Sequence, residues 1–391
     1  MYCMRALLSF LCIVMGVYSL QSQQQTDSIT QELKRIQESS NLVGFAVAIV
    51  NKDSTVYSKG FGYSNKEQQQ PYTTKTVQPI ASISKTLLGV ALMKAQEMGL
   101  LDLDDPINDH LPFTIQNPFY PNEPITIRQL ANHTSSILDT EHYNKIYIFN
   151  DSIPPFYENL PQESKQGVKQ EVDIFNNNQM MPASQFIKNQ YCTDGKWYTS
   201  NSFSNTVPGS TYDYSNMGAN IVAFIIAEVS DMGYTKFLQK YILNPIQMDN
   251  SGWASKDHPL ENASKLYWYG NPIPQYEFIT YGDGGFMTNI EDFSQYLMAV
   301  MKGYNGESNI LKASSYNEML SQPVSKEFKK NVFWTIDDEK IGHSGNDPGI
   351  ISHAYFLREG SHGIIVFVNT SEVENDMISV RDIYRTLLKH M

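Results

Sequence analysis

Cysteine is scarce in this sequence. The chain has three cysteines, and two of them, Cys3 and Cys12, lie in its first twenty residues. When that segment is set aside, Cys192 alone remains, which excludes an intrachain disulfide and a cysteine-based metal site. Because no histidine is close to it in the sequence, we interpret Cys192 as a small packed side chain.

Positive charge is scarce as well. The chain has 29 Lys and Arg against 41 Asp and Glu, a formal net charge of −12 at pH 7, and the basic residues form no run. Nucleic acids and anionic membrane surfaces are bound by clustered Lys and Arg. We therefore expect neither of them as a partner.

Long apolar runs are missing except at the N-terminus, where Arg5 precedes the apolar residues 6–20. The run is short for a membrane span and is followed by small residues and glutamines, a pattern that predicts a secretory signal peptide over residues 1–22. The alternative is an uncleaved N-terminal anchor. We expect a secreted or periplasmic protein with no stable membrane insertion after signal removal.

The remaining chain, residues 23–391, is long enough for one large domain, and 41% of all residues are hydrophobic. Strand-like segments at both ends predict an α/β part over residues 23–80 and 280–391, with a mostly helical part over 81–279 between them. Residues 141–209 are rich in Asn, Gln, Tyr and Pro. They form either long loops or an insertion with short helices. Four tyrosines of this segment could line a pocket, although ordinary half-buried packing is the simpler interpretation of them. These are Tyr143, Tyr147, Tyr157 and Tyr191.

Apolar periodicity predicts the individual elements. The expected strands cover residues 44–50, 55–61, 340–344, 353–357 and 363–368. The expected helices cover residues 26–40, 82–98, 125–133, 220–229, 234–243 and 375–390. We also expect Met98 on the buried face of its helix, and a capping box formed by Thr288 and Glu291.

The first chemical signal is Ser82-Ile83-Ser84-Lys85 at the start of an apolar helix. Ser82 and Lys85 stand three residues apart, so a helical turn brings hydroxyl and amine together. The amine can take the proton of the hydroxyl if burial and the helix N-terminus lower its pKa. Alone, the motif is one that chance also supplies.

Further short motifs follow in a meaningful order. They are Ile125–Ser135, Tyr214-Ser215-Asn216, Tyr241–Met248, Asp283–Thr288 and His343-Ser344-Gly345. Together with Ser82 and Lys85 they resemble the serine β-lactamase-like hydrolases: class C β-lactamases, penicillin-binding DD-peptidases, D-aminopeptidases and related esterases. The chain departs from that pattern at Ser136 and Gln247, where a glycine is usual.

The resemblance implies an α+β fold of the β-lactamase type, with an antiparallel sheet built from both chain ends, flanking helices and an inserted helical region. It implies that Ser82 attacks a carbonyl and forms an acyl-enzyme, while Lys85 shares the proton of the hydroxyl. Tyr214 would be the partner base and the proton donor to the leaving group. Asn216 would bind the substrate amide and hold Lys85, and the backbone N–H groups of Ser82 and Asn346 would form the oxyanion hole.

His343 is the main departure, because β-lactamases usually have a lysine there. Histidine is mostly neutral above its ordinary pKa near 6.5, so a fixed charge for a substrate carboxylate is weakened. This favours a peptidase or esterase over a β-lactamase, with Ser344 and Gly345 completing the substrate-binding strand. The alternative for His343 is a core-edge histidine bonded to backbone.

We therefore expect an exported serine hydrolase that cleaves an amide or ester bond in a small molecule or peptide, first among them D-amino-acid or cell-wall peptides. The alternatives are a true class C-like β-lactamase and a non-catalytic penicillin- or peptide-binding protein. No cofactor or metal is expected, since the acidic cluster Asp102, Asp104 and Asp105 has no histidines at ligand spacing and suits turn and cap positions. The oligomeric state stays open.

Overall fold

The computed structural model describes residues 26–255, 259–325 and 327–391. The predicted signal peptide, residues 1–22, lies outside them. Within the described ranges, no helix combines the length and the apolar character that crossing a membrane requires.

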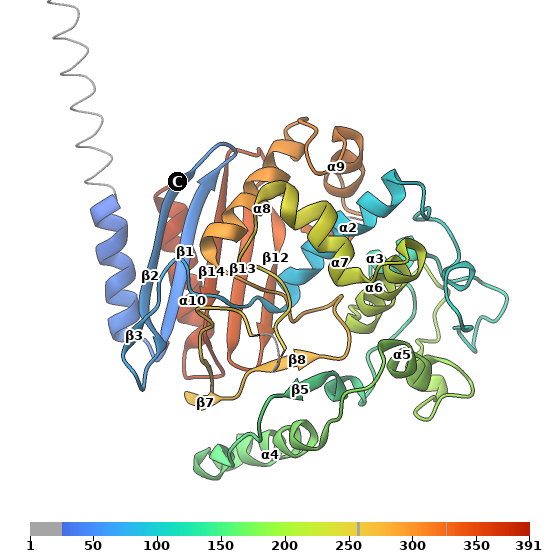
Figure 1. The fold of residues 1–391 in the computed structure, drawn as a ribbon, viewed down its shortest axis with the longest axis horizontal. Coiled ribbons are helices and arrows are strands. Elements are labelled where there is room, and N and C mark those ends of the chain that lie inside the picture. The colour runs from blue at the N-terminus through green and yellow to red at the C-terminus, as the bar shows by residue number, and fades with distance from the viewer. Residues whose placement is uncertain (1–25, 256–258, 326) are drawn as a thin grey trace, which may run out of the picture.

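An eight-stranded antiparallel sheet, with strands from both ends of the chain, is the centre of the fold (Figure 1). Across the sheet, the strands are β10 (Lys330–Asn331), β11 (Trp334–Ile336), β12 (Lys340–Asp347), β13 (Ile350–Leu357), β14 (His362–Val368), β1 (Gly44–Asn51), β2 (Thr55–Asn65) and β3 (Gln70–Pro71). The pairing of β1 with β14 joins the two ends of the chain. The predicted α+β arrangement is confirmed.

Helices cover both faces of this sheet. Strand β1 is apolar at every position from Phe45 to Val50 rather than at alternate ones, as expected of a strand buried on both sides. Phe45 and its alternate neighbours pack with the helix over residues 26–39 and with α10 (Asp376–Lys389). Ala46 and its alternate neighbours belong to the larger core on the other face, which includes α8 (Ile290–Tyr304).

Helix α2 (Ser84–Glu97) lies between the sheet and the helical region, where it packs on α6 (Asn216–Ser230) (Figure 1). Its residues are buried on nearly all sides. At Gly89 a methyl group would lie 2.5 Å from the carbonyl oxygen of Val332, so glycine lets the β10–β11 hairpin approach the helix. The central helix thus places its N-terminus at the point where sheet and helical region meet.

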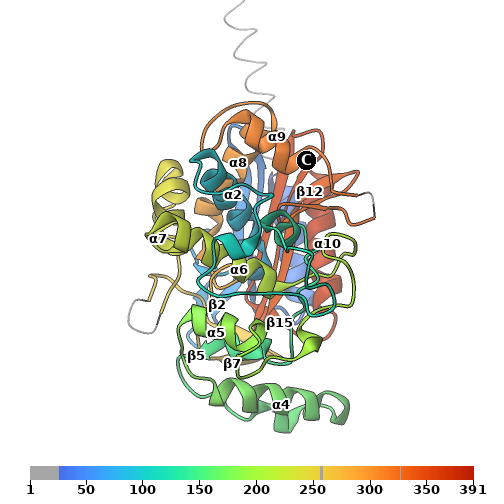
Figure 2. The same ribbon diagram turned by 90° about the vertical axis from the view of Figure 1, so that its right-hand side faces the viewer.

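Residues 141–209 form an insertion with helices, not only loops. It contains β5 (Tyr147–Phe149), α4 (Gln162–Asn177) and α5 (Ala183–Tyr191), and β5 pairs with β8 (Tyr276–Phe278). Helix α4 runs along the edge of the molecule away from the sheet (Figure 2). Of the two alternatives, the helical insertion is correct, although α4 with its 16 residues is longer than expected.

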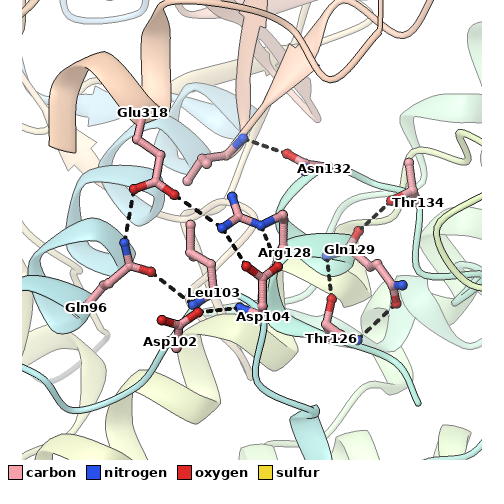
Figure 3. A network of polar contacts seen from close by, with 11 residues as sticks. Gln96, Asp102, Leu103, Asp104, Thr126, Arg128, Gln129, Asn132, Thr134 and Glu318 are labelled. Carbon is pink, nitrogen blue, oxygen red and sulfur yellow. Dashed lines mark hydrogen bonds and ion pairs between the residues drawn. The ribbon is translucent and has the colours of Figure 1, made fainter. Parts of the chain in front are cut away.

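The remaining elements are short or peripheral. They are α3 (Ile127–Ala131), α7 (Tyr234–Leu238), α9 (Ala313–Leu320), and the small strands β4 (Gln78–Pro79), β6 (Leu266–Trp268), β7 (Asn271–Ile273), β9 (Met287–Thr288) and β15 (Thr370–Ser371). Polar side chains join several of them around α3 (Figure 3). There Arg128 makes two hydrogen bonds to Asp104 and a third to Glu318, and Asn132 accepts the N–H of Val332. This network attaches the β10–β11 hairpin to α3 and α9.

Two local predictions are wrong. Met98 is 39% exposed, because it lies just past the end of α2. The capping box does not form. Thr288 belongs to β9 and its hydroxyl bonds Ser251, so α8 is capped one residue later by Asn289.

Candidate active site

A pocket of about 490 Å³ opens where the turn before α2, the start of α6 and strand β12 meet. Lys85 lies beneath it, and the other seven residues predicted for the site line its walls: Ser82, Tyr214, Asn216, His343, Ser344, Gly345 and Asn346. These residues come from three distant segments of the chain. The structure therefore brings the whole predicted set together.

Ser82 lies in a 3-10 turn (Ala81–Ile83) directly before α2. Ala81 has a φ of 50°, a left-handed conformation that costs a non-glycine residue about 1 kcal/mol or more. The turn is held by the Ser84 hydroxyl, which donates to the carbonyl oxygen of Ala81 at 2.7 Å. The strained turn presents the Ser82 hydroxyl to the pocket.

The ammonium group of Lys85 uses all three of its N–H donors. Nζ donates to Ser82 Oγ at 3.0 Å, to Asn216 Oδ1 at 2.8 Å and to the carbonyl oxygen of Asp283 at 2.9 Å. The side chain is fully buried. Because an ammonium has three donors and no more, these contacts fix its orientation toward Ser82.

Tyr214 contacts the same hydroxyl, with its OH donating to Ser82 Oγ at 3.1 Å. Its ring centroid lies 4.4 Å from that of the buried His133, and Nδ1 of His133 accepts the N–H of Ser215 at 3.2 Å. Burial lowers the pKa of His133 well below its ordinary value, with Lys330 and Lys85 acting in the same direction. A neutral imidazole thus supports the tyrosine ring.

Asp139, which sequence reasoning missed, holds the start of α6. Its carboxylate accepts hydrogen bonds from the Ser215 hydroxyl, from the N–H groups of Asn216 and Met217, and from the side-chain amide of Asn216, all between 2.8 and 2.9 Å. The predicted helix start at residue 220 is therefore too late, since α6 begins at Asn216. No local pattern around Asp139 indicates this role.

We expect Asp139→Ala to lower the free energy of unfolding by about 2–3 kcal/mol, because several donors lose a charged acceptor at a helix N-terminus. We also expect kcat to fall more than KM rises, since Asn216 then no longer holds Lys85 in place. Urea unfolding and steady-state kinetics measure both effects. The matched control is Asp151→Ala, an exposed carboxylate further along the chain, and equal behaviour of the two variants would contradict the prediction.

Strand β12 forms the opposite wall. At Gly345 a methyl group would lie 2.8 Å from both the Ala81 side chain and the Ile80 carbonyl oxygen. The hydroxyl of Ser352, on β13, donates to the same Ile80 oxygen at 2.7 Å. Glycine is therefore required where the strand passes the turn that carries Ser82.

His343 is buried and bonded to backbone, yet it also lines the pocket. Its Nδ1 lies 2.5 Å from the carbonyl oxygen of Ser344 and therefore carries the proton, which leaves Nε2 to accept from Lys330 Nζ at 3.3 Å. Burial lowers the pKa of His343 well below its ordinary value, and the Lys330 charge acts in the same direction. His343 is thus both a histidine bonded to backbone at the edge of the core and a residue of the pocket wall.

Lys330, on β10, is the second residue that sequence reasoning missed. It is buried, donates to Thr335 Oγ1 at 2.6 Å and lines the pocket beside His343. Burial and the charge of Lys85 lower its pKa to about 8, so most of it is still charged at pH 7. A positive charge that the neutral His343 does not provide therefore lies beside it on β10, with β11 between the two strands.

The other end of the pocket is acidic. Tyr143 donates a hydrogen bond to Asp283 Oδ2, and Tyr147 donates one to Asp347 Oδ1 at 2.7 Å. Burial raises the pKa of both carboxyl groups, that of Asp347 to about 7. These two tyrosines line the pocket, whereas the hydroxyl of Tyr191 donates to a backbone carbonyl outside it.

Protein flp of Staphylococcus aureus strain MW2 is 22% identical over 356 residues, which cover 89% of this chain and 63% of that protein. The chain therefore spans less than two thirds of that relative's length.

Two solved structures share the fold. The octameric penicillin-binding protein homologue from Pyrococcus abyssi has a TM-score of 0.68 at 22% identity, covering 94% of this chain and 77% of that one. The D-amino acid amidase of Ochrobactrum anthropi SV3 has a TM-score of 0.63 at 19% identity, covering 93% of this chain and 99% of that one.

A family model described as Beta-lactamase matches residues 29–385. Because that match runs from the helix over residues 26–39 into α10, the chain belongs to the beta-lactamase family.

Proposed function

We propose that this protein is an exported serine hydrolase that cleaves an amide or ester bond through an acyl-enzyme on Ser82. One observation carries the proposal. Ser82 Oγ accepts hydrogen bonds from Lys85 Nζ at 3.0 Å and from Tyr214 OH at 3.1 Å, at the wall of a pocket large enough for a small peptide. A binding protein has no need for a hydroxyl between two proton-transfer groups.

The proton of Ser82 has to leave as its oxygen attacks. Either Lys85 in its amine form or Tyr214 in its phenolate form takes that proton. The new Oγ–carbon bond forms, the bond to the leaving group breaks, and Tyr214 returns a proton to the departing amine or alkoxide. A water molecule then attacks the acyl-enzyme in the reverse sequence and releases the acid.

The oxyanion of the tetrahedral intermediate would be bound by the N–H groups of Ser82 and Asn346. Both residues line the pocket, and Gly345 allows β12 to lie against the turn that carries Ser82. Losing one such donor costs about 10²–10³ in rate. Asn216, which accepts from Lys85 and donates to Asp139, would bind the substrate amide with its remaining amide N–H.

Substrate turnover tests the proposal. Purified protein is compared on D-alanyl peptides, p-nitrophenyl esters and nitrocefin, with Ser82→Ala as the blank. We expect peptide or ester turnover that Ser82→Ala abolishes. Fast nitrocefin turnover would favour a β-lactamase, because the Lys330 charge also suits a β-lactam carboxylate, and no turnover of any substrate would contradict the proposal.

Lys330 is proposed to bind a carboxylate on the leaving group. We expect Lys330→Met to lower kcat/KM for a peptide with a free C-terminal carboxylate about 10- to 100-fold more than for its C-terminal amide, since a charge-assisted hydrogen bond is lost. Because burial and Lys85 lower the pKa of Lys330 to about 8, KM for the carboxylate peptide should rise as the pH passes 8. Lys329→Met, the same change at the exposed neighbour, is the control, and an equal loss for peptide and amide would contradict this role.

A further inference from the structure

The pocket has charges of opposite sign at its two ends. The charged Lys330 lies at one end beside the neutral His343, and Asp283 and Asp347 lie at the other end. Burial and the neighbouring carboxylate both raise the pKa of Asp347. The two carboxylates therefore repel each other in a site that a cation would stabilise.

Asp283 also has an unused acceptor. The residue is 2% exposed, and its Oδ1 is buried without a hydrogen-bond partner among the described residues. Burial raises the pKa of this carboxyl more than the charge of Lys85 and the nearby Asn220 lower it. The side-chain oxygen of Asn220 accepts the N–H groups of Gly282 and Asp283, and one N–H of its amide faces the sulfur of Met217. A buried carboxylate oxygen without a donor is costly unless a ligand supplies one.

The strand register places Ser82 between the two ends. His343, Gly345 and Asp347 alternate along β12, so they face the same side of the strand, and the first and last are about 13 Å apart along it. Gly345, in the middle, lies against Ala81 beside the nucleophile. A peptide of two or three residues extends about 7–10 Å, a length comparable with this spacing.

Tyr214 shows which end receives which part of the substrate. Its ring lies 5.8 Å from Lys330 Nζ and 6.3 Å from the His343 ring. Since Tyr214 is the proposed proton donor to the leaving group, the leaving group occupies the basic end. The acyl part then extends toward Asp283 and Asp347.

We propose that Asp283 and Asp347 bind a primary ammonium group on the acyl part of the substrate. This inference rests on the proposed acyl transfer to Ser82, and it makes the preferred substrate a short peptide with an amine on the acyl side and a carboxylate on the leaving side.

A second pocket adjoins the acidic end of the first pocket. It has a volume of about 200 Å³, shares Tyr147, Asn346 and Asp347 with the first, and adds Glu171 and Glu372. Burial raises the pKa of Glu171, and Glu372 acts in the same direction. No Lys, Arg or His is among the described residues that line it. The acyl side is therefore acidic beyond the first pocket, which leaves room for an amine on a longer side chain.

Matched substrates test the subsite at pH 7.5. One pair is D-alanyl-p-nitroanilide with its N-acetyl derivative, which probes an α-ammonium. The other is 6-aminohexanoyl-p-nitroanilide with hexanoyl-p-nitroanilide, which probes an amine further from the carbonyl. We expect at least a tenfold higher kcat/KM for the amine in one pair. Asp347→Asn and Asp283→Asn, which keep an oxygen for the two tyrosines, should reduce that ratio to below threefold, whereas the exposed Asp338→Asn should preserve it.

The outcomes separate the two proposals. Turnover of the neutral substrates without an amine preference, or a preference that survives in both pocket variants, would overturn the ammonium subsite alone. No turnover of any substrate and no covalent adduct on Ser82 would overturn the proposed function, and this inference with it. If Asp283→Asn melts too low to be assayed, Asp347→Asn decides the question, because its side chain is only half-buried.

Discussion

Ser82→Ala should abolish hydrolysis of every substrate, with a loss on the order of 10⁴-fold or more in kcat. The reason is that no other hydroxyl among the described residues can take the place of Ser82 as the nucleophile. Ser82 Oγ is the oxygen that accepts from both Lys85 and Tyr214, and the Ser84 hydroxyl is turned away to bond the Ala81 carbonyl. Without Ser82, the pocket can still bind and polarise a substrate but cannot form the covalent intermediate.

Covalent labelling measures this directly. The protein is incubated with a fluorophosphonate or a labelled penicillin, and the modified peptide is located by mass spectrometry. We expect the adduct on Ser82 in the native protein and none in Ser82→Ala. Ser361→Ala, at an exposed position in a hairpin turn, serves as the control and should label fully. An adduct on another residue, with hydrolysis surviving in Ser82→Ala, would contradict the mechanism.

Lys85→Met should lower kcat about 10³- to 10⁴-fold, within the upper range for a proton-transfer group. Methionine fills a similar volume but cannot accept a proton, and it leaves the Asn216 and Asp283 acceptors unpaired. Lys85→Arg distinguishes two roles for the lysine, because arginine keeps the charge and does not deprotonate in proteins. If Lys85 transfers a proton, both variants should be inactive.

The double variant gives a second check. Groups that act as one unit are not additive, so Ser82→Ala with Lys85→Met should be no slower than Ser82→Ala alone. Thermal melts of all variants show whether they remain folded. Substantial activity in Lys85→Arg would show that Lys85 acts only through its charge, and additive losses in the double variant would show that the two residues work separately.

The predictions that succeeded depend on neighbours in the sequence. Ser82 and Lys85 meet because one helical turn separates them, and the glycine at position 99 ends α2 with a φ of 68°. The two positions where a usual glycine is missing, Ser136 and Gln247, both have a positive φ of 65° and 58°. A sequence pattern can indicate a position that needs a positive φ, because this need arises from the backbone of a few neighbouring residues.

The predictions that failed or were absent depend on distant pairing. Lys329 and Lys330 look alike in the sequence, yet the first is exposed and the second is buried beside His343. That difference arises because β11 pairs with both β10 and β12 and so carries β10 toward the pocket. The role of Asp139 also depends on distant parts of the chain, since the groups that donate hydrogen bonds to its carboxylate lie more than seventy residues later.

The sequence by itself determined the fold class and indicated Ser82, Lys85 and Tyr214, the trio that we propose to react, because apolar periodicity and short motifs are properties of contiguous residues. Only the tertiary structure decided the charges around that trio. Lys330 and Asp283 are 47 residues apart by their numbers, and nothing local to either indicates that they line one pocket. Burial and strand pairing set where these charges lie, and through them which substrate the pocket can hold.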